Sequence, residues 1–160
     1  MTFDNSRTII SLRIKLFVAT VVILAYIILT YFARLIKFPL LGMSETAWTL
    51  ILVGFSLFVA FLPLYLNYQF IYFSDDGENI VFRYFTAGVF GGRKNSVQIN
   101  KKTFSGYKTD SSLFGLIQSI TLFQKYNNGV AKYPPVYISA LNREEKAKVF
   151  RSLNLYSSPA

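Results

Sequence analysis

The residue types that most often carry chemistry are scarce in this chain. It contains no histidine and no cysteine, and only eight of its 160 residues are acidic. Zinc and iron sites depend mainly on histidine and cysteine ligands, so the composition argues strongly against a transition-metal enzyme. Without these residues no ordinary nucleophile–base pair can be assembled, and serine–lysine chemistry has no motif here. The sequence therefore predicts a protein that is not an enzyme and that holds no metal or cofactor.

The densest group of acids lies in the segment Asp75-Asp76-Gly77-Glu78-Asn79. Carboxylates bind hard divalent cations, but this spacing does not fit an EF-hand loop. Gly and Asn beside Asp are typical of a tight turn between two strands. We therefore interpret the segment as a hairpin turn and expect no metal site.

Basic residues offer a more promising candidate site, because the net charge is +9. The Gly-rich loop over residues 86–94 contains Phe90, Arg93 and Lys94. A phenylalanine that dips into a membrane surface beside two phosphate-binding cations would suit anionic lipid, at about 1 kcal/mol per basic residue. The alternative is a flexible linker with solvated charges. Lys101 and Lys102 either extend this patch, form a partner site, or protect a strand edge from pairing; these five residues are the candidate contact surface.

Two long uncharged stretches must position these side chains, and they run over Leu16–Ala33 and Thr46–Ser74. Each is long enough to cross a bilayer core of about 30 Å, which takes roughly 20 helical residues. We expect a polar lead over residues 1–15, then a transmembrane helical hairpin over 16–67 with spans near 16–36 and 46–66. Tyr26 is the only polar-tipped aromatic deep in the first span, and we expect it to bond to the second helix.

Charges near the ends of the spans predict their orientation. Arg7, Arg13 and Lys15 precede the first span, and Arg34 and Lys37 follow it. Because positive residues stay on the cytoplasmic side, and two spans return the chain to its starting side, both termini are expected in the cytoplasm. A cleavable signal peptide is a poor interpretation, because the apolar run is too long and Arg34-Leu35-Ile36-Lys37 follows where a small-residue cleavage site should lie.

After the spans the hydrophobic period changes to two residues, which is typical of strands. We expect short strands near 68–73, 80–85, 96–99, 103–108, 118–126 and 130–138, with Asn127-Asn128-Gly129 as a hairpin turn. Asn142 is expected to cap a closing amphipathic helix over about 142–153. The expected fold class is an α+β membrane protein: the hairpin, then an antiparallel sheet or partial barrel over 68–160, closed by that helix.

Three segments carry a resemblance to a known family: the run Phe70–Gly77, the strand at Val97-Gln98-Ile99, and the run Tyr133–Ser139 leading into the closing helix. With the two apolar spans, this pattern resembles bacterial membrane proteins that join two transmembrane helices to a pleckstrin-homology-like (PH-like) domain. The resemblance implies a lipid- or protein-binding module. In eukaryotic relatives of the fold, basic residues in the first hairpin loop bind phosphoinositides, whereas the corresponding loop here, Asp75–Asn79, is acidic.

The resulting hypothesis is a non-enzymatic protein of the bacterial inner membrane. We expect an accessory or scaffold subunit whose PH-like domain binds a protein partner at the membrane surface, in a larger membrane complex or a homo-oligomer. The alternative is an envelope protein that binds anionic lipid or senses the bilayer. Membrane lipids are expected contacts under both hypotheses. No basic motif belongs to a known nucleic-acid module, so nucleic acid is not an expected partner.

Overall fold

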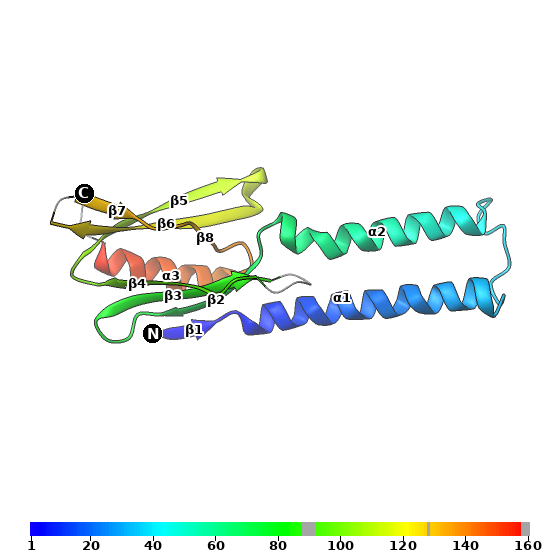
Figure 1. Ribbon diagram of the computed structural model, residues 1–160, viewed down its shortest axis with the longest axis horizontal. Helices are drawn as coiled ribbons and strands as arrows, with labels where there is room; N and C mark the ends of the chain where they lie inside the picture. The colour runs from blue at the N-terminus through cyan, green and yellow to red at the C-terminus, as the bar shows by residue number, and fades with distance from the viewer. Residues whose placement is uncertain (88–91, 128, 158–160) are drawn as a thin grey trace. The chain divides into compact units, whose positions relative to one another are not determined.

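The computed structural model describes residues 1–87, 92–127 and 129–157, and the chain divides into two compact units. Unit 1 comprises Met1–Ile9 with Leu64–Ala160, and unit 2 comprises Ile10–Pro63. The elements, labelled in Figure 1, are β1 (Thr2–Asp4), α1 (Ser6–Ile27), η1 (Ile28–Phe32), α2 (Glu45–Tyr65), β2 (Gln69–Ser74), β3 (Asn79–Thr86), β4 (Asn95–Asn100), β5 (Phe104–Ser112), η2 (Leu113–Gly115), β6 (Ile117–Tyr126), β7 (Gly129–Lys132), β8 (Val136–Tyr137) and α3 (Arg143–Tyr156).

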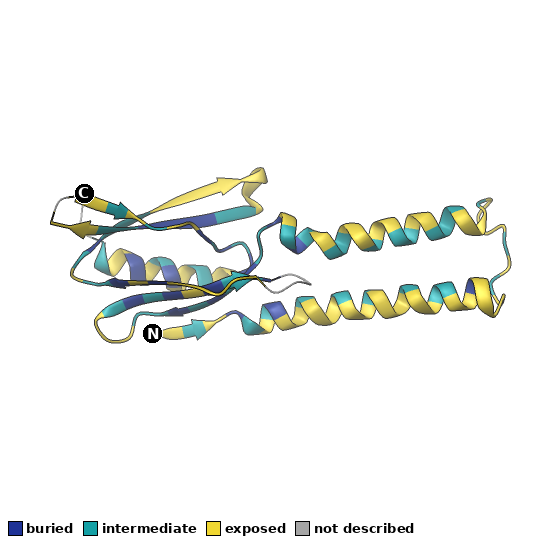
Figure 2. Ribbon diagram, viewed as in Figure 1, coloured by how far each residue is buried: buried dark blue, intermediate teal, exposed yellow. Residues whose placement is uncertain are grey.

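Unit 2 is built from two helices that are long and apolar enough to cross a membrane, Ser6–Phe32 and Glu45–Tyr65. The first ends in one π-helical segment, η1. Large apolar side chains such as Phe55 and Phe58 are about two-thirds exposed, at 66% and 65%. Figure 2 shows both helices mainly in the colours of exposed and intermediate residues. Exposed apolar surface of this extent is costly in water.

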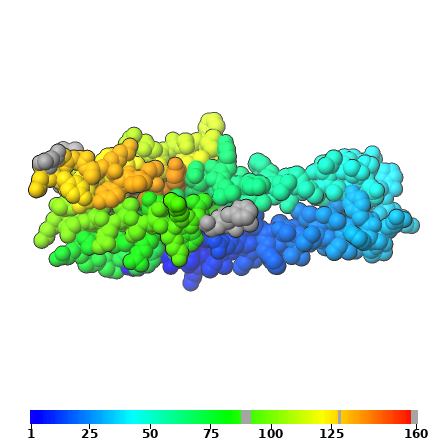
Figure 3. Space-filling model, viewed as in Figure 1, coloured from blue at the N-terminus to red at the C-terminus, as the bar shows by residue number. Residues whose placement is uncertain are grey.

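Polar contacts join the two helices of unit 2 near the connecting loop. The hydroxyl of Tyr31 shares a 2.8 Å hydrogen bond with Oγ1 of Thr49, and the hydroxyl of Tyr26 lies 3.4 Å from the same atom. The indole of Trp48 donates to the carbonyl oxygen of Leu40 at 3.0 Å. The prediction that Tyr26 bonds to the second helix is therefore confirmed. Figure 3 shows the atoms of the two helices lying along one another.

Unit 1 contains two antiparallel sheets, one with the order β1-β2-β3-β4 and one with the order β5-β6-β7, to which β8 adds on β6. The alternation of the sequence explains which face is buried. In β3 the side chains of Ile80, Phe82 and Tyr84 are buried while Arg83 between them is exposed. Figure 2 shows the buried residues running along the strands of this unit.

One hydrophobic core connects the two sheets and α3. Ile71, Phe73 and Phe82 come from the first sheet, and the core also takes in Val149 and Leu153 from α3. Asn142 caps α3 as expected, because its Oδ1 accepts from the Glu145 amide at 2.8 Å while the Glu145 carboxylate accepts from the Asn142 amide at 2.8 Å. The α+β class with antiparallel sheets and a closing helix is confirmed. No pairing among the described strands joins the sheets into a closed barrel.

The first residues of the chain differ from the expected polar lead over residues 1–15. Residues Thr2–Asp4 form a strand that pairs with β2, and Phe3 packs its ring against Phe73 with centroids 5.6 Å apart. The helix already begins at Ser6. A three-residue strand leaves too little alternation to be visible in a sequence. The sheet domain expected over 68–160 therefore also includes the first nine residues of the chain.

Candidate functional site: a basic aromatic groove

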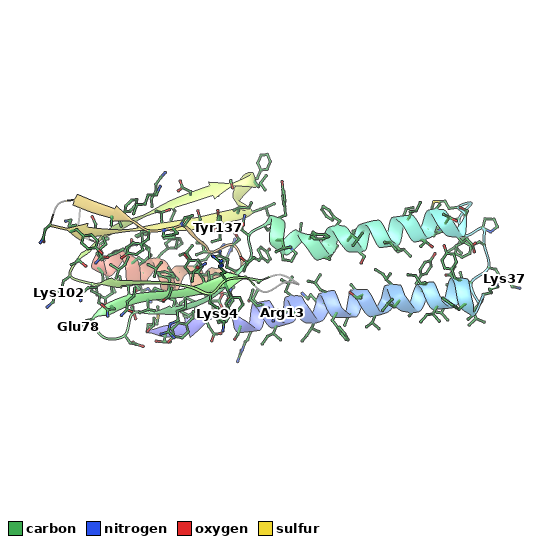
Figure 4. All side chains as sticks on the ribbon, viewed as in Figure 1. Arg13, Lys37, Glu78, Lys94, Lys102 and Tyr137 are labelled. Carbon is green, nitrogen blue, oxygen red and sulfur yellow. The ribbon has the colours of Figure 1, made fainter. Side chains whose placement is uncertain are left out.

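The four predicted contact residues that the structure describes do not form one patch. Phe90 lies outside the described residues. Arg93 and Lys94 are exposed immediately before β4, whereas Lys101 and Lys102 follow its last residue. Six residues of strand separate the two pairs by about 20 Å. Figure 4 accordingly shows Lys94 at one end of unit 1, and Lys102 with Glu78 at the other.

Lys101 makes several contacts within the protein. Its Nζ donates to the carbonyl oxygen of Asp75 at 2.6 Å and lies 4.4 Å from the ring centroid of Tyr156. Its backbone amide donates to the carbonyl oxygen of Glu78 at 2.9 Å. Lys101 therefore connects the β2–β3 turn, the β4–β5 turn and α3, while Lys102 beside it is exposed.

Lys94 lies in a groove on the outer face of the first sheet, which we call the basic aromatic groove. Its volume is about 400 Å³. The lining residues come from β2, β3 and the start of β4: Phe70, Tyr72, Arg83, Tyr84, Phe85, Lys94, Asn95 and Ser96. The register of the hairpin places these side chains together, because Phe70 is paired with Phe85 and Tyr72 with Arg83. Such directly opposed residues present their side chains on the same face of a sheet.

Aromatic rings and two cations give this groove its chemistry. The rings of Phe70 and Phe85 stack with centroids 4.8 Å apart, and the Arg83 guanidinium lies 5.7 Å from the ring centroid of Tyr72. Within the described parts of the chain, neither Arg83 nor Lys94 forms an ion pair. The groove therefore combines a net positive charge with flat apolar surface, which suits an anion attached to an apolar group.

A second groove, of about 440 Å³, offers less chemistry. It is lined by Ser105, Gly106, Tyr107, Phe123, Val130, Asn154 and Ser157. None of these side chains is charged at neutral pH. The basic aromatic groove is consequently the better candidate site.

A buried polar joint fixes the end of the first sheet at which β2 begins. Asn5 is fully buried; its Nδ2 donates to the Gln69 carbonyl oxygen at 2.9 Å, and its Oδ1 accepts from the Ile71 amide at 2.8 Å. The side-chain oxygen of Gln69 accepts from the Tyr137 amide at 3.0 Å. Beside this joint, Ile9 packs with Ala87 and Ala140. The start of α1, the start of β2 and the end of β8 are therefore held together.

The acidic turn after β2 is engaged within the protein. The amino group of Met1 contacts the carboxylates of Asp75 and Asp76, and the hydroxyls of Thr2 and Ser152 donate to Asp76 and Asp75 respectively. Burial alone would raise the pKa of Asp75, but the hydrogen bonds from the Met1 amine and Ser152 outweigh it and the pKa is lowered. Among the described residues no cluster of three metal-ligating side chains occurs. These carboxylates are thus structural partners in a hairpin turn.

No family model matches the chain, and neither the curated proteins nor the solved structures contain a significant match to it.

Sequence reasoning missed Arg83, which supplies one of the two cations of the groove. The information was present in the alternation of the first hairpin. If Asp75–Asn79 is the turn, then Phe70 and Tyr72 fall on the face opposite to Ile71 and Phe73, together with Arg83 and Phe85. Because Arg83 lies in a strand and not in a loop, its neighbours follow only from the register of β2 and β3.

Proposed function

We propose that this protein is a non-enzymatic, membrane-anchored accessory or scaffold subunit whose sheet domain is PH-like and binds a protein partner at the membrane surface. The basic aromatic groove carries the proposal. Two cations beside stacked rings would accept an acidic segment of the partner that also carries an apolar or aromatic side chain. Rings and an Arg of this kind are typical energetic centres of interfaces.

The helical hairpin supports the membrane part of the proposal. Its two helices are long and apolar enough to span a bilayer, and their exposed apolar side chains would face lipid or neighbouring helices. Arg7, Arg13 and Lys15 lie in the N-terminal part of α1, against Arg34 and Lys37 in the connection to α2, and this excess favours a bacterial inner-membrane location with both termini in the cytoplasm. A larger membrane complex, or an assembly of identical copies, would then place several such domains at one membrane surface.

Binding of anionic lipid is the second candidate function, and a specific observation favours it. Phe70 follows the last residue of α2, Tyr65, by only five positions in the chain, so the groove starts close to the point where the chain leaves a span. A headgroup phosphate between Arg83 and Lys94 is chemically equivalent to a partner carboxylate. The two functions differ in what occupies the groove, and one experiment separates them.

The test is affinity purification of the tagged full-length protein in mild detergent, with proteins and lipids both identified. The informative variant is Arg83→Glu with Lys94→Glu, which reverses both charges of the groove. We expect one stoichiometric protein to co-purify with the wild type and to be lost from this variant. A matched control, Lys148→Glu with Arg151→Glu, reverses two charges on the exposed side of α3 and should retain the partner.

The possible results of this purification distinguish the two candidate functions. Co-purification of no protein contradicts the scaffold proposal, and so does a partner that survives the groove reversal. Enrichment of anionic lipid that is lost from the groove variant alone would favour the second candidate.

A further inference from the structure

The tip of the β5–β6 hairpin exposes an apolar cluster that the proposed groove does not use. Phe114 is fully exposed, and Leu116 and Leu113 are 60% and 40% exposed. The preceding half of β5 is also exposed, so the hairpin extends beyond the core of unit 1. We call Leu113, Phe114 and Leu116 the apolar tip. Three large apolar side chains adjacent in a short loop are unusual on a surface that faces only water.

The backbone of the apolar tip is held in a conformation that ordinary residues avoid. Leu113 has φ of 49° and Phe114 has φ of 55°, both in the left-handed region, followed by Gly115 at 90°. Residues with large side chains rarely adopt this conformation, and it persists where function or surrounding structure requires it. Here it presents the Phe114 ring outward, since this side chain is completely accessible.

Hydrogen bonds place this tip at a defined end of unit 1. The amide of Gln118, beside the tip, donates to Oγ of Ser139 at 3.0 Å, and the Ile138 amide donates to the Gln118 carbonyl oxygen at 2.8 Å. One residue before Ile138, the backbone amide of Tyr137 donates to Oε1 of Gln69 at 3.0 Å. The base of the tip therefore adjoins the first residue of β2.

Both connections to the apolar helices leave unit 1 at this same end. Leu66, just before β2, is buried, and Ile9 of α1 packs with Ala87 and Ala140. Ala140 itself follows Ser139, the residue that bonds to the base of the tip. If the two helices cross a bilayer, the chain passes between it and unit 1 within a few residues of this end of the unit.

The charges around the tip are compatible with a lipid surface. Asp110 is the acid on the strand leading to the tip, and Lys108 compensates it with an ion pair of 2.9 Å. Lys146 lies at the base of the hairpin, where its Nζ donates to Oε1 of Gln118 at 2.7 Å. Among the described residues the tip thus carries no uncompensated negative charge toward anionic headgroups.

We propose that the apolar tip inserts Leu113, Phe114 and Leu116 into the headgroup region of the same bilayer that the two helices cross. This inference depends on the membrane anchoring in the proposed function, but not on what fills the basic aromatic groove. The tip would form a third contact with the bilayer and fix the orientation of the sheet domain relative to the membrane. Aromatic side chains are well suited to this interfacial depth.

The test uses the full chain in vesicles of phosphatidylcholine and phosphatidylglycerol, with an environment-sensitive fluorophore on a single introduced cysteine. The protein has no native cysteine, so each label reports one position. Ser112→Cys places the label beside the intact tip, Val21→Cys places it within α1, and Lys102→Cys places it at the far end of unit 1. Lipids with a doxyl group near the headgroup or along the acyl chain serve as quenchers.

We expect quenching and a blue-shifted emission at positions 21 and 112, and neither at position 102. Adding Phe114→Ser and Leu116→Ser should remove most of the quenching at position 112 and leave that at position 21 unchanged. A quenched label at 21 with an unquenched one at 112 would overturn this inference alone. A blue shift at 112 without lipid quenching means that protein covers the tip, which also overturns it. An unquenched label at 21 would remove the membrane anchor, and the inference with it.

Discussion

Asn5 is the side chain that connects the N-terminal segment to β2 most directly. It is fully buried and satisfies the Gln69 carbonyl and the Ile71 amide of β2. In Asn5→Ala both groups lose their partner, and each buried unsatisfied group costs about 1–3 kcal/mol. We expect the free energy of unfolding to fall by about 2–6 kcal/mol in a denaturant titration in detergent. Gln98→Ala removes an exposed amide from β4 and should change it little; equal effects of the two variants would contradict this role.

Asp75 should make the free energy of unfolding depend on pH in the acidic range. Burial raises the pKa of Asp75, but the hydrogen bonds from the Met1 amine and Ser152 together lower it by more. The pKa in the folded protein is therefore below that in the unfolded chain. A carboxyl group with a depressed pKa stabilises the fold above the unfolded pKa, and the contribution is lost as pH falls through the folded pKa. Asp75→Asn should therefore destabilise the protein at pH 7, and the difference from wild type should shrink below about pH 4. Denaturation midpoints between pH 7 and 3 measure this, and a difference that grows toward low pH would refute it.

At the scale of elements, β1 and β2 are indispensable to the sheet domain although they flank the helical hairpin in sequence. Ile71 of β2 is fully buried in the core, and β1 covers the outer edge of β2. A fragment starting at residue 72 lacks β1 and the first half of β2. We expect this fragment to show no cooperative thermal transition by circular dichroism. A cooperative transition in the isolated fragment would show that these strands are dispensable.

The N-terminal cap of α3 gives a milder effect. Asn142 and Glu145 exchange hydrogen bonds in a capping box, each of 2.8 Å. Asn142→Ala should reduce the free energy of unfolding by about 1 kcal/mol, while Asn142→Ser retains an acceptor at the same position and should lose much less. A denaturant titration of both variants distinguishes the cap from a general effect of substitution at this position.

Elements of this chain were predictable wherever one periodic pattern dominated. The apolar helices, the alternating strands and the Asn142 cap all follow from local sequence, and the structure contains them. β1 was not predictable, because three residues carry too little pattern and its pairing with β2 spans about seventy positions in the chain. The candidate site was only partly predictable: Lys94 was evident in a loop, while Arg83 joins it only through the register of β2 and β3.

At the scale of the whole protein, two units of different character serve one proposed purpose. The helices of unit 2 expose apolar side chains and are apolar enough to span a membrane, whereas unit 1 has a hydrophobic core and a charged aromatic groove. Anchoring a domain to a membrane confines its search for partners to one surface, which raises their effective concentration. A groove of modest affinity is then sufficient for stable association.

Photo-crosslinking in cells from Tyr72 tests the central claim most directly. Replacing this groove residue with p-benzoylphenylalanine in the full-length protein keeps an aromatic ring and makes it reactive. We predict one crosslinked protein product that disappears in the Arg83→Glu background and that does not form from Tyr126, an exposed residue on β6. No protein product, crosslinks to lipid alone, or the same product from Tyr126 or in the presence of Arg83→Glu, would contradict the claim that the groove binds a protein partner.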